Sequence, residues 1–348
     1  MQDAHRADRN GHRAERKARR DERKAERKRR GTGRFVALGI LVFALAFAGG
    51  VASRLLIKPA GTERYTVAWS DAIGTRQTDL PYGDRPANRF DLYLPTDSSR
   101  DRYGLVVYLH AGGFTSGDKS DDEQTLAWLC SRGYVAAGIN YTLFSEDNPD
   151  ANVLTQSEEI REAIPYVVKA AQDAGYDVDQ MAVAGGSAGG CLALIYGYRD
   201  AAASPVPVRM VFEAVGPSSF YPEDWTNYGF DKPENLEAAC GLFSVMTGST
   251  LTPDMYGTPA WDEAIKPVSA LLWVDDQTVP TVMAYGTYDT LQPYLASVRL
   301  DAALTEYGVP HEYFVAEHSG HGLQNDDAVS MAYMAKVEEY LDRYLPVE

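Results

Sequence analysis

A serine enclosed by glycines is the strongest chemical signal in this sequence. Ser187 lies in residues 185–190, which read GGSAGG, contain the pattern G-x-S-x-G and directly follow the apolar run 181–184. The pattern alone is weak, but its place between a predicted strand and a predicted helix strengthens it. A serine on such a sharp turn needs small neighbours, because the flanking backbones approach closely. We predict that Ser187 is a nucleophile raised above a sheet; the alternative is a glycine-rich helix start that only packs.

A serine nucleophile needs a base, and histidine is the usual one. After residue 58 the chain has four histidines, at positions 110, 311, 318 and 321. His318 and His321 follow the apolar stretch 312–316, and the carboxyl end of a strand there brings them to the catalytic side of a sheet. We predict that His321, which lies between two glycines, is the base, and we expect His318 to be structural.

The third member is an acid that orients the histidine. In one recurring chain order of this triad, the acid lies between the serine and the histidine, on the loop after a strand. Asp289 fits, because it follows the apolar run 281–285, whereas Asp275 and Asp276 precede that run. We predict that Asp289 holds the imidazole tautomer and stabilises the imidazolium. A role as a turn or helix N-cap residue is the alternative.

Two glycines after an earlier apolar run provide the groups that stabilise an oxyanion. Residues 110–114 read HAGGF and follow the run that starts at residue 104. Glycines leave backbone N–H groups free to face a pocket, and each well-placed donor contributes about 3 kcal/mol. We predict that the N–H groups of Gly112, Gly113 and Ala188 bind the oxyanion. A plain turn is the alternative.

The segments between these residues predict the scaffold that positions them. Expected strands cover 89–94, 104–110, 134–141, 181–184, 210–215, 281–285 and 312–316, and expected helices cover 122–130, 157–174, 188–198, 294–307 and 328–344. Continuous apolar runs are typical of strands that are buried on both faces. The alternation of strands and helices predicts an α/β fold with a mostly parallel sheet flanked by helices. We place this catalytic domain at residues 80–348, after a connector at 58–79.

One interval is too long for an ordinary crossover. Residues 217–279 separate two predicted strands and are rich in aromatic side chains. Long insertions in a compact domain are usually functional or disordered, and this one is too aromatic for disorder. We predict a lid or pocket wall in which the substrate contacts Phe114, Phe220, Tyr221 and Trp225. The alternative is that the aromatic side chains form a satellite core of their own.

An uncharged segment near the N-terminus predicts a membrane address. Residues 1–34 carry 14 Lys/Arg against 6 Asp/Glu, whereas residues 35–53 carry no charge and the apolar stretch resumes up to residue 57. At about 1.5 Å per residue, a transmembrane helix over 35–57 spans the hydrocarbon core of a bilayer. The positive-inside rule then places the basic tail in the cytoplasm and the catalytic domain outside. The alternative is signal-peptide cleavage near Ala48, which secretes the domain.

Charge and cysteine content exclude several function classes. The formal net charge is −16 and residues 1–34 are basic, so the remainder sums to −24. A domain this acidic repels polyanions, which argues against a nucleic-acid partner. Three cysteines are too few and too scattered for a disulfide framework or a zinc site, and we expect them to be buried as small apolar side chains. The predicted chemistry needs no metal or organic cofactor.

Together, these motifs resemble the α/β-hydrolase superfamily, and within it the hormone-sensitive-lipase-like and carboxylesterase branch. In that branch the oxyanion loop commonly reads HGGG, the nucleophile turn reads GDSAGG, and a stretch like NYRLAPE follows the next strand. The counterparts here are HAGGF at 110–114, GGSAGG at 185–190 and NYTLFSE at 140–146. The sequences GDK at 117–119 and FDLYLP at 90–95 also look like small exported esterases and feruloyl-esterase-like members.

The resemblance covers about residues 80–345 and departs from the branch pattern at two positions. Ala111 replaces the first glycine of the oxyanion motif, and Gly186 replaces the aspartate beside the nucleophile. Neither change removes a predicted catalytic group. The resemblance implies a serine carboxylesterase or lipase-like enzyme that hydrolyses a neutral small-molecule ester through an acyl-enzyme. Two alternatives stay open: a serine peptidase or amidase with the same triad, and a non-catalytic membrane-tethered binding module.

Overall fold

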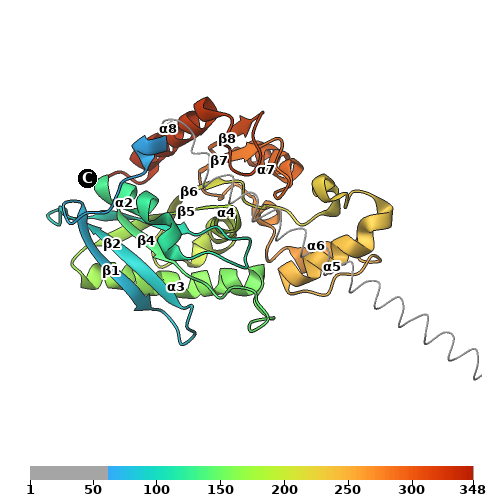
Figure 1. Cartoon of the computed structure of the whole chain (residues 1–348), viewed down its shortest axis with the longest axis horizontal. Helices are drawn as coiled ribbons and strands as arrows, with labels where there is room; N and C mark the ends of the chain where they lie inside the picture. The colour runs from blue at the N-terminus through green and yellow to red at the C-terminus, as the bar shows by residue number, and fades with distance from the viewer. Residues whose placement is uncertain (1–61, 348) are drawn as a thin grey trace, which may run out of the picture.

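The computed structural model describes residues 62–347. The predicted cytoplasmic tail, the predicted transmembrane segment 35–57 and the first part of the predicted connector lie outside the described residues. Within residues 62–347, no helix has both the length and the apolar character needed to cross a bilayer. The described residues form an α/β structure in which helices cover a central sheet (Figure 1).

Eight strands form one sheet in the order β1-β2-β4-β3-β5-β6-β7-β8. The antiparallel pairings are those of β2 with β1 and β4, and all other pairings are parallel. The bounds are β1 Gly74–Pro81, β2 Arg89–Pro95, β3 Tyr103–Leu109, β4 Val135–Ile139, β5 Val178–Gly186, β6 Val208–Ala214, β7 Thr281–Gly286 and β8 His311–Ala316. Parallel strands bring their carboxyl ends to one edge of the sheet, where functional loops gather.

Helices cover both faces of this sheet. α2 (Glu123–Ser131) and α8 (Asp327–Tyr344) lie on one face, where Arg132 pairs with Glu338 at 3.5 Å. α3 (Val153–Asp173) and α4 (Ala188–Ile195) pack against each other on the other face, and α7 (Tyr294–Glu306) packs against β7 and β8 (Figure 1). Every residue of β4 and β7 is buried, as their continuous apolar runs predict.

The predicted strands and helices are all present, with shifted ends. α3 begins at Val153, four residues before its predicted start, because Asn152 caps it by accepting the Thr155 N–H at 3.0 Å. α4 ends at Ile195 and continues as a π-helical turn, Tyr196–Asp200. β1 lies mostly in the predicted connector. Six of its eight residues are exposed, so this edge strand has no apolar pattern, and the sheet begins before residue 80.

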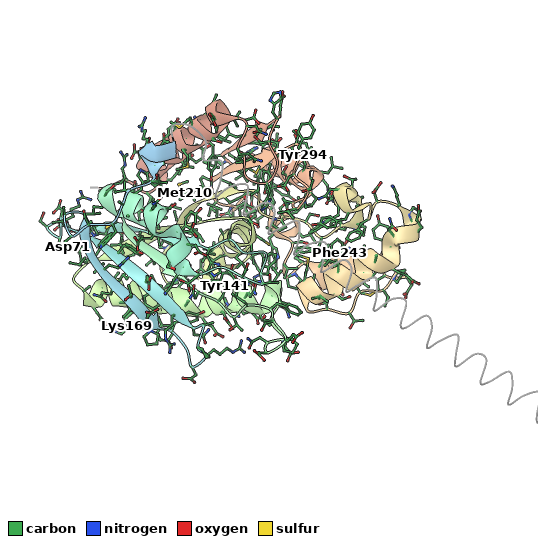
Figure 2. The ribbon with its side chains drawn as sticks, in the orientation of Figure 1. Asp71, Tyr141, Lys169, Met210, Phe243 and Tyr294 are labelled. Carbon is green, nitrogen blue, oxygen red and sulfur yellow. The ribbon has the colours of Figure 1, made fainter. Side chains whose placement is uncertain are left out.

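The chain between β6 and β7 forms a layer beside the sheet, with α5 (Leu236–Thr247), α6 (Pro259–Ile265) and several single 3-10 turns (Figure 1). An aromatic cluster holds this insertion together. Phe243 of α5, labelled in Figure 2, lies at its centre. Its ring centroid is 5.1–6.3 Å from the ring centroids of Phe220, Trp225, Phe230 and Trp261, in edge-to-face arrangements. The insertion therefore has an aromatic core of its own, and its action as a lid or pocket wall stays a prediction.

The three cysteines, Cys130, Cys191 and Cys240, are free and buried. Burial raises the pKa of Cys130 to about 12 and the pKa of Cys240 to about 11. At neutral pH these thiols are protonated and behave as small apolar groups. This confirms the prediction made from their apolar surroundings.

Candidate active site

The backbone turns sharply at Ser187, between β5 and α4, with φ 54° and ψ −120°. A positive φ on a non-glycine residue costs about 1–3 kcal/mol and persists only where the surrounding structure enforces it. The neighbouring glycines permit the close approach. A Cβ on Gly189 would lie 1.9 Å from the Leu109 carbonyl oxygen, and one on Gly185 would lie 2.4 Å from the Gly189 carbonyl carbon. The turn therefore holds Ser187 at the carboxyl edge of the sheet.

Ser187, His321 and Asp289 form a continuous hydrogen-bonded chain. His321 Nε2 lies 2.8 Å from Ser187 Oγ, and His321 Nδ1 lies 2.7 Å from Asp289 Oδ2. Asp289 follows β7 and His321 follows β8, so parallel strands bring both side chains to the edge that carries Ser187. When Nδ1–H donates to the carboxylate, Nε2 is the ring nitrogen that accepts a proton from the Ser187 hydroxyl.

The carboxylate of Asp289 is buried, with only 6% of the residue exposed, and both its oxygens are used. Oδ1 accepts the N–H groups of Leu291 and Gln292 at 2.8 and 2.9 Å, while Oδ2 faces His321. The turn role and the orienting role weighed for Asp289 are thus carried by different oxygens. The backbone donors fix the direction in which the carboxylate meets the imidazole.

The other three histidines of the described residues have other partners than the Ser187 hydroxyl. His318 is exposed and bonds Asp326 at 3.0 Å, a hydrogen bond that raises the pKa of His318. His311 begins β8, at the opposite edge of the sheet. His110 is buried and stacks on Tyr141, with ring centroids 4.3 Å apart. Of the four histidines in the described residues, His321 is the one that forms a hydrogen bond with the Ser187 hydroxyl.

The loop after β3 has a tight left-handed backbone, with φ 139° at Gly112, 58° at Gly113 and 67° at Phe114. The Gly112 carbonyl accepts hydrogen bonds from the Ser116 N–H and hydroxyl, both at 2.9 Å. Ala188 is the first residue of α4, and the first N–H groups of a helix have no intrahelical acceptor. Within residues 62–347, no acceptor pairs with the N–H groups of Gly112, Gly113 or Ala188. These three donors are thus available to a ligand oxygen.

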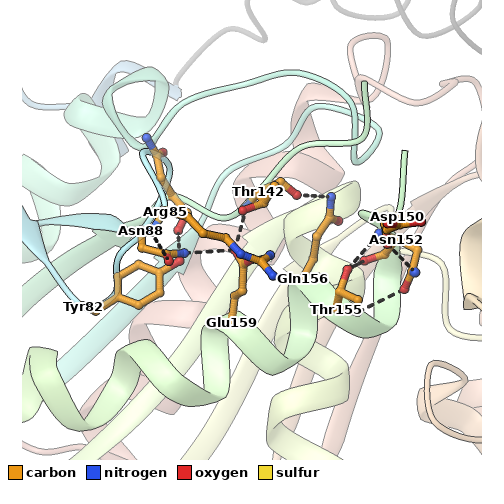
Figure 3. Close-up of polar contacts among 10 residues, drawn as sticks. Tyr82, Arg85, Asn88, Thr142, Asp150, Asn152, Thr155, Gln156 and Glu159 are labelled. Atoms are coloured by element: carbon orange, nitrogen blue, oxygen red, sulfur yellow. Dashed lines mark hydrogen bonds and ion pairs between the residues drawn. The ribbon is translucent and has the colours of Figure 1, made fainter. Parts of the chain in front are cut away.

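A buried face of α3 holds this loop in place through side-chain hydrogen bonds. Gln156 Nε2 donates to the carbonyl oxygens of Phe114 and Thr142, both at 2.9 Å. One turn further along, Glu159 accepts the Thr142 N–H at 2.7 Å and pairs with Arg85 (Figure 3). Gln156 is fully buried and Glu159 nearly so. The helix therefore fixes the backbone on the C-terminal side of the glycine pair.

A second polar network ties the same loop to β1, β2 and β4. Lys119 is almost fully buried, and its Nζ lies 2.9 Å from Asp79 Oδ1 and 3.3 Å from Asp91 Oδ1. The Asn140 side chain accepts the Lys119 N–H and donates to Asp118, each at 2.6 Å. Burial alone raises the pKa of Asp118, but hydrogen bonds, led by that of Asn140, outweigh it and hold the pKa at about 2. These contacts give the sequences at 117–119 and 140–146 a positioning role.

An open pocket lies beside this loop, with about 480 Å³ of unfilled space when its solvent-exposed mouth is included. Its walls come from residues 113–115 of the loop, Phe144, residues 151–153 at the start of α3, and one side of α5. The α5 residues are Leu242, Val245 and Met246. Phe114, predicted to contact substrate, lines this pocket.

The other residues predicted to contact substrate do not line this pocket. Phe220 and Trp225 are 0% and 1% exposed and pack against Phe243 in the aromatic cluster. The Tyr221 hydroxyl donates to Asp262. Phe220 and Trp225 thus contribute to the aromatic core of the insertion, and contact of these three residues with substrate stays a prediction.

Sequence reasoning missed the residues of α3 and α5 that shape the site. Gln156 precedes the helix predicted at 157–174, and Glu159 belongs to no predicted motif. Leu242, Val245 and Met246 are apolar at i, i+3 and i+4 spacing, which marks one side of a helix but not what that side contacts. The spacing was the available signal for the α5 wall, and nothing in the pattern marked Gln156.

One carboxyl group is fully buried behind the Ser187 turn. Glu213 of β6 is 0% exposed, and its Oε2 accepts the Gly216 N–H at 2.9 Å. A Cβ on Gly190 of α4 would lie 2.9 Å from the same oxygen. Burial raises the pKa of Glu213 to about 8, and among the described residues no cationic side chain pairs with it. Glu213 therefore holds a proton at neutral pH.

The chain matches a protein family over most of the sheet. The BD-FAE family model covers residues 90–304, from β2 into α7. This span is more than half of the chain and includes Ser187 and Asp289. His321 follows it.

Among curated proteins, the chain is similar to kynurenine formamidase of Salmo salar, 30% identical over 31% of this chain and 34% of that protein. It is also similar to esterase LipI of Mycobacterium tuberculosis, 26% identical over 66% of this chain and 68% of that protein. The matched part thus spans about a third of the length of the formamidase. Among solved structures, esterase B of Lactobacillus rhamnosis superposes with a TM-score of 0.63, covering 86% of this chain and 95% of that one at 18% identity. Identity this low supports a shared fold alone.

Proposed function

The chain belongs to the BD-FAE family, an α/β-hydrolase esterase family, and from that premise we propose that it is a serine hydrolase of carboxylic esters. The observation that carries the proposal is the hydrogen-bonded chain from Asp289 through His321 to Ser187. A nucleophile, a base and an orienting acid in contact at one sheet edge have the geometry that acyl transfer requires. The relative named esterase LipI supports the same reaction class.

In the first half-reaction, Ser187 Oγ attacks the ester carbonyl carbon while His321 Nε2 takes the hydroxyl proton. The carbonyl oxygen becomes an oxyanion and accepts the free N–H groups of the glycine loop and of Ala188. Each well-placed donor lowers the barrier by about 3 kcal/mol, because the full charge develops only in the transition state. The intermediate collapses when His321 protonates the leaving alkoxide, and the acyl group stays on Ser187.

In the second half-reaction, His321 takes a proton from water, and the resulting hydroxide attacks the acyl carbon. The same N–H donors stabilise the second oxyanion, and Ser187 leaves with the proton that His321 returns. Asp289 touches neither the substrate nor the water. It keeps Nδ1 protonated and stabilises the imidazolium that forms in each half-reaction.

The substrate that fits best is a small neutral ester. The chain outside the basic tail has a formal charge of −24, because the whole chain sums to −16 and residues 1–34 contribute +8. Such a surface repels anionic substrates, and the pocket beside the glycine loop is lined almost wholly by apolar side chains. The charge of the domain therefore supports a neutral or cationic ester, and the pocket supports an uncharged one.

We place this reaction outside the cytoplasm, on a domain held at the membrane by residues 35–57. The support is the order of charges along residues 1–58: residues 1–34 are basic, residues 35–53 carry no charge, and the apolar stretch then continues up to residue 57. Secretion after cleavage near Ala48 is the alternative. Peptide mapping of washed membranes tests both, because an anchor retains residues 1–58 and cleavage gives a chain that starts near residue 49.

A second candidate reaction is amide hydrolysis by the same three residues. The observation that favours it is the similarity to a protein named as a formamidase. The chemistry differs only in the leaving group, which His321 protonates as an amine. Turnover of amide model substrates without turnover of the matching esters would favour this candidate over the esterase.

The test is hydrolysis of p-nitrophenyl esters by the full chain, with Ser187→Ala as the decisive variant. We expect kcat/KM to fall by about 10⁴-fold or more in Ser187→Ala, because the acyl-enzyme has no other site to form on. Ser99→Ala, in an exposed loop, is the matched control and keeps full activity. Equal turnover by Ser187→Ala and the unaltered chain would overturn the proposal. No turnover of esters or amides would favour the binding-module alternative.

A further inference from the structure

The apolar pocket beside the loop after β3 has a feature that the proposed reaction does not itself explain. It is bounded on one side by Gly113 and Phe114 and on the other by Leu242, Val245 and Met246 of α5. No residue of its lining is charged. A pocket of this kind binds an apolar group and gives no partner to a charged one.

The α5 wall is fixed from behind by the aromatic cluster. Leu242, Val245 and Met246 are spaced at i, i+3 and i+4, so they share one side of the helix. Phe243 points to another side and packs against four aromatic rings. Leu242 and Met246 are also buried, at 9% and 8% exposed. One side of α5 thus anchors the helix in the insertion, and another side faces the pocket.

The position of the pocket relative to the catalytic groups decides which part of an ester it receives. The pocket touches Gly113, whose N–H faces the carbonyl oxygen in the proposed reaction, and its lining takes no residue from the loops that carry Asp289 and His321. The leaving alkoxide must meet His321 Nε2 to be protonated, so it departs on the histidine side. The group on the other side of the carbonyl carbon is the acyl substituent.

We propose that this pocket binds the acyl chain, and that α5 sets its length, so that the substrates are esters of apolar, unbranched carboxylic acids longer than acetate. The proposal rests on the proposed esterase function. Burial of each methylene against these side chains raises kcat/KM by about fourfold until the pocket is full. Selectivity for the acid then resides in α5, within the insertion, and the chemistry resides at the strand ends.

The experiment compares p-nitrophenyl esters from acetate to octanoate on the full chain and on Val245→Trp. Val245 is only half-buried, so an indole there narrows the pocket without crowding the aromatic cluster. We expect the octanoate-to-acetate ratio of kcat/KM to fall at least tenfold, because the indole occupies the space that the longer acyl chain would fill. Glu237→Trp, on an exposed side of the same helix, is the matched control and leaves the ratio unchanged.

A second substrate series separates the acyl side from the alcohol side. Acetate esters of alcohols from ethanol to octanol vary the leaving group alone. If Val245→Trp depresses the longer members of this series and leaves the acyl series unchanged, the pocket binds the alcohol and the proposal is wrong. If neither series responds while the unaltered chain hydrolyses both, the pocket is outside the substrate path and the proposal is again wrong.

Binding of the neutral ester methyl octanoate to Ser187→Ala, measured by calorimetry, tests the pocket without catalysis. We expect Val245→Trp in that background to weaken methyl octanoate binding at least tenfold, and Glu237→Trp to leave it unchanged. If the unaltered chain hydrolyses no ester, the esterase function is refuted and this binding measurement still decides on the pocket. Equal methyl octanoate binding with and without the indole would refute the pocket.

Discussion

The strand ends and the insertion reach order by different means. At the strand ends, the backbone is constrained: Ser187 holds a positive φ, and Gly189 packs so close to Leu109 that a Cβ would overlap its carbonyl oxygen. In the insertion, side chains provide the order, through aromatic rings that surround Phe243. Backbone constraint fixes positions closely, which chemistry needs. Side-chain packing fills space, and its shape changes with single substitutions. We therefore assign the rate of ester hydrolysis to the strand ends and the selectivity for the acyl group to the insertion.

The largest test of this division concerns the base. His321→Ala should lower kcat/KM for every ester by about 10⁴-fold, because no other group takes the Ser187 proton. His318→Ala, three residues away, is the control and should stay within about twofold, since its side chain is exposed and bonds Asp326. Steady-state assays of both variants decide. Comparable losses in the two would place the base elsewhere and remove the strand ends from the chemistry.

The next test weakens the aromatic core of the insertion. Phe243→Ala removes the central ring of the cluster, and we expect it to lower the free energy of unfolding by about 3–5 kcal/mol. Below the unfolding temperature, acetate turnover should persist while the preference for longer acyl chains weakens, because α5 loses its support. Urea denaturation and the p-nitrophenyl series measure the two effects. Tyr166→Ala, which removes an exposed ring on α3, is the control. Equal loss of acetate and octanoate turnover would show that the insertion supports the catalytic groups as well as the acyl preference, and would contradict the division between the two regions.

A buried proton gives the strand ends a pH dependence of their own. The pKa of Glu213 is about 8 in the folded chain and is raised from 4.5. The folded state therefore keeps a proton that the unfolded state releases, and stability falls as pH rises from about 4.5 to about 8. The slope is about 1.4 kcal/mol per pH unit. Urea denaturation across this window should show that slope flattened in Glu213→Gln and intact in Glu237→Gln, which changes an exposed side chain. An unchanged slope in Glu213→Gln would show that Glu213 ionises normally.

The smallest effect is expected from Gln156, which supports the glycine loop by a hydrogen bond to Phe114 and does not line the pocket. Gln156→Met removes the donor from the Phe114 and Thr142 carbonyl oxygens, and we expect kcat to fall about tenfold with KM unchanged. Gln172→Met, on the same helix, loses one longer bond of 3.3 Å and should keep its kcat. A rise in KM without a change in kcat would make Gln156 part of the substrate pocket and not a support of the oxyanion donors.

Much of the scaffold was predictable because its strands are buried on both faces. β4 and β7 read as continuous apolar runs, and the structure buries every one of their residues. β1 was missed because it is an edge strand of largely exposed polar residues. Ser187, Asp289 and His321 could be selected from the sequence because each of them closely follows a predicted strand. The hydrogen bonds between the three are a property of the fold, and the predicted catalytic roles await the assays.

The pocket was beyond the sequence for a different physical reason. Phe220 and Trp225 stood out by size, but large rings fill a core as readily as they line a site. Leu242, Val245 and Met246 look like any apolar side of a helix, and only the fold shows that this side faces the glycine loop. Gln156 and Glu159 belonged to no predicted motif, because a helix pattern does not reveal which polar side chains have backbone partners.

The burial of the three free thiols affects how the protein is made and handled. Cys130, Cys191 and Cys240 have no disulfide to form in the native fold, so maturation in an oxidising compartment needs no disulfide isomerase and reducing agents leave the native chain unchanged. Thiolates are the reactive form, and burial keeps these groups protonated. Iodoacetamide should therefore label the chain only after denaturation. Alkylation then measures the unfolded fraction of the protein, whichever side of a membrane the domain occupies.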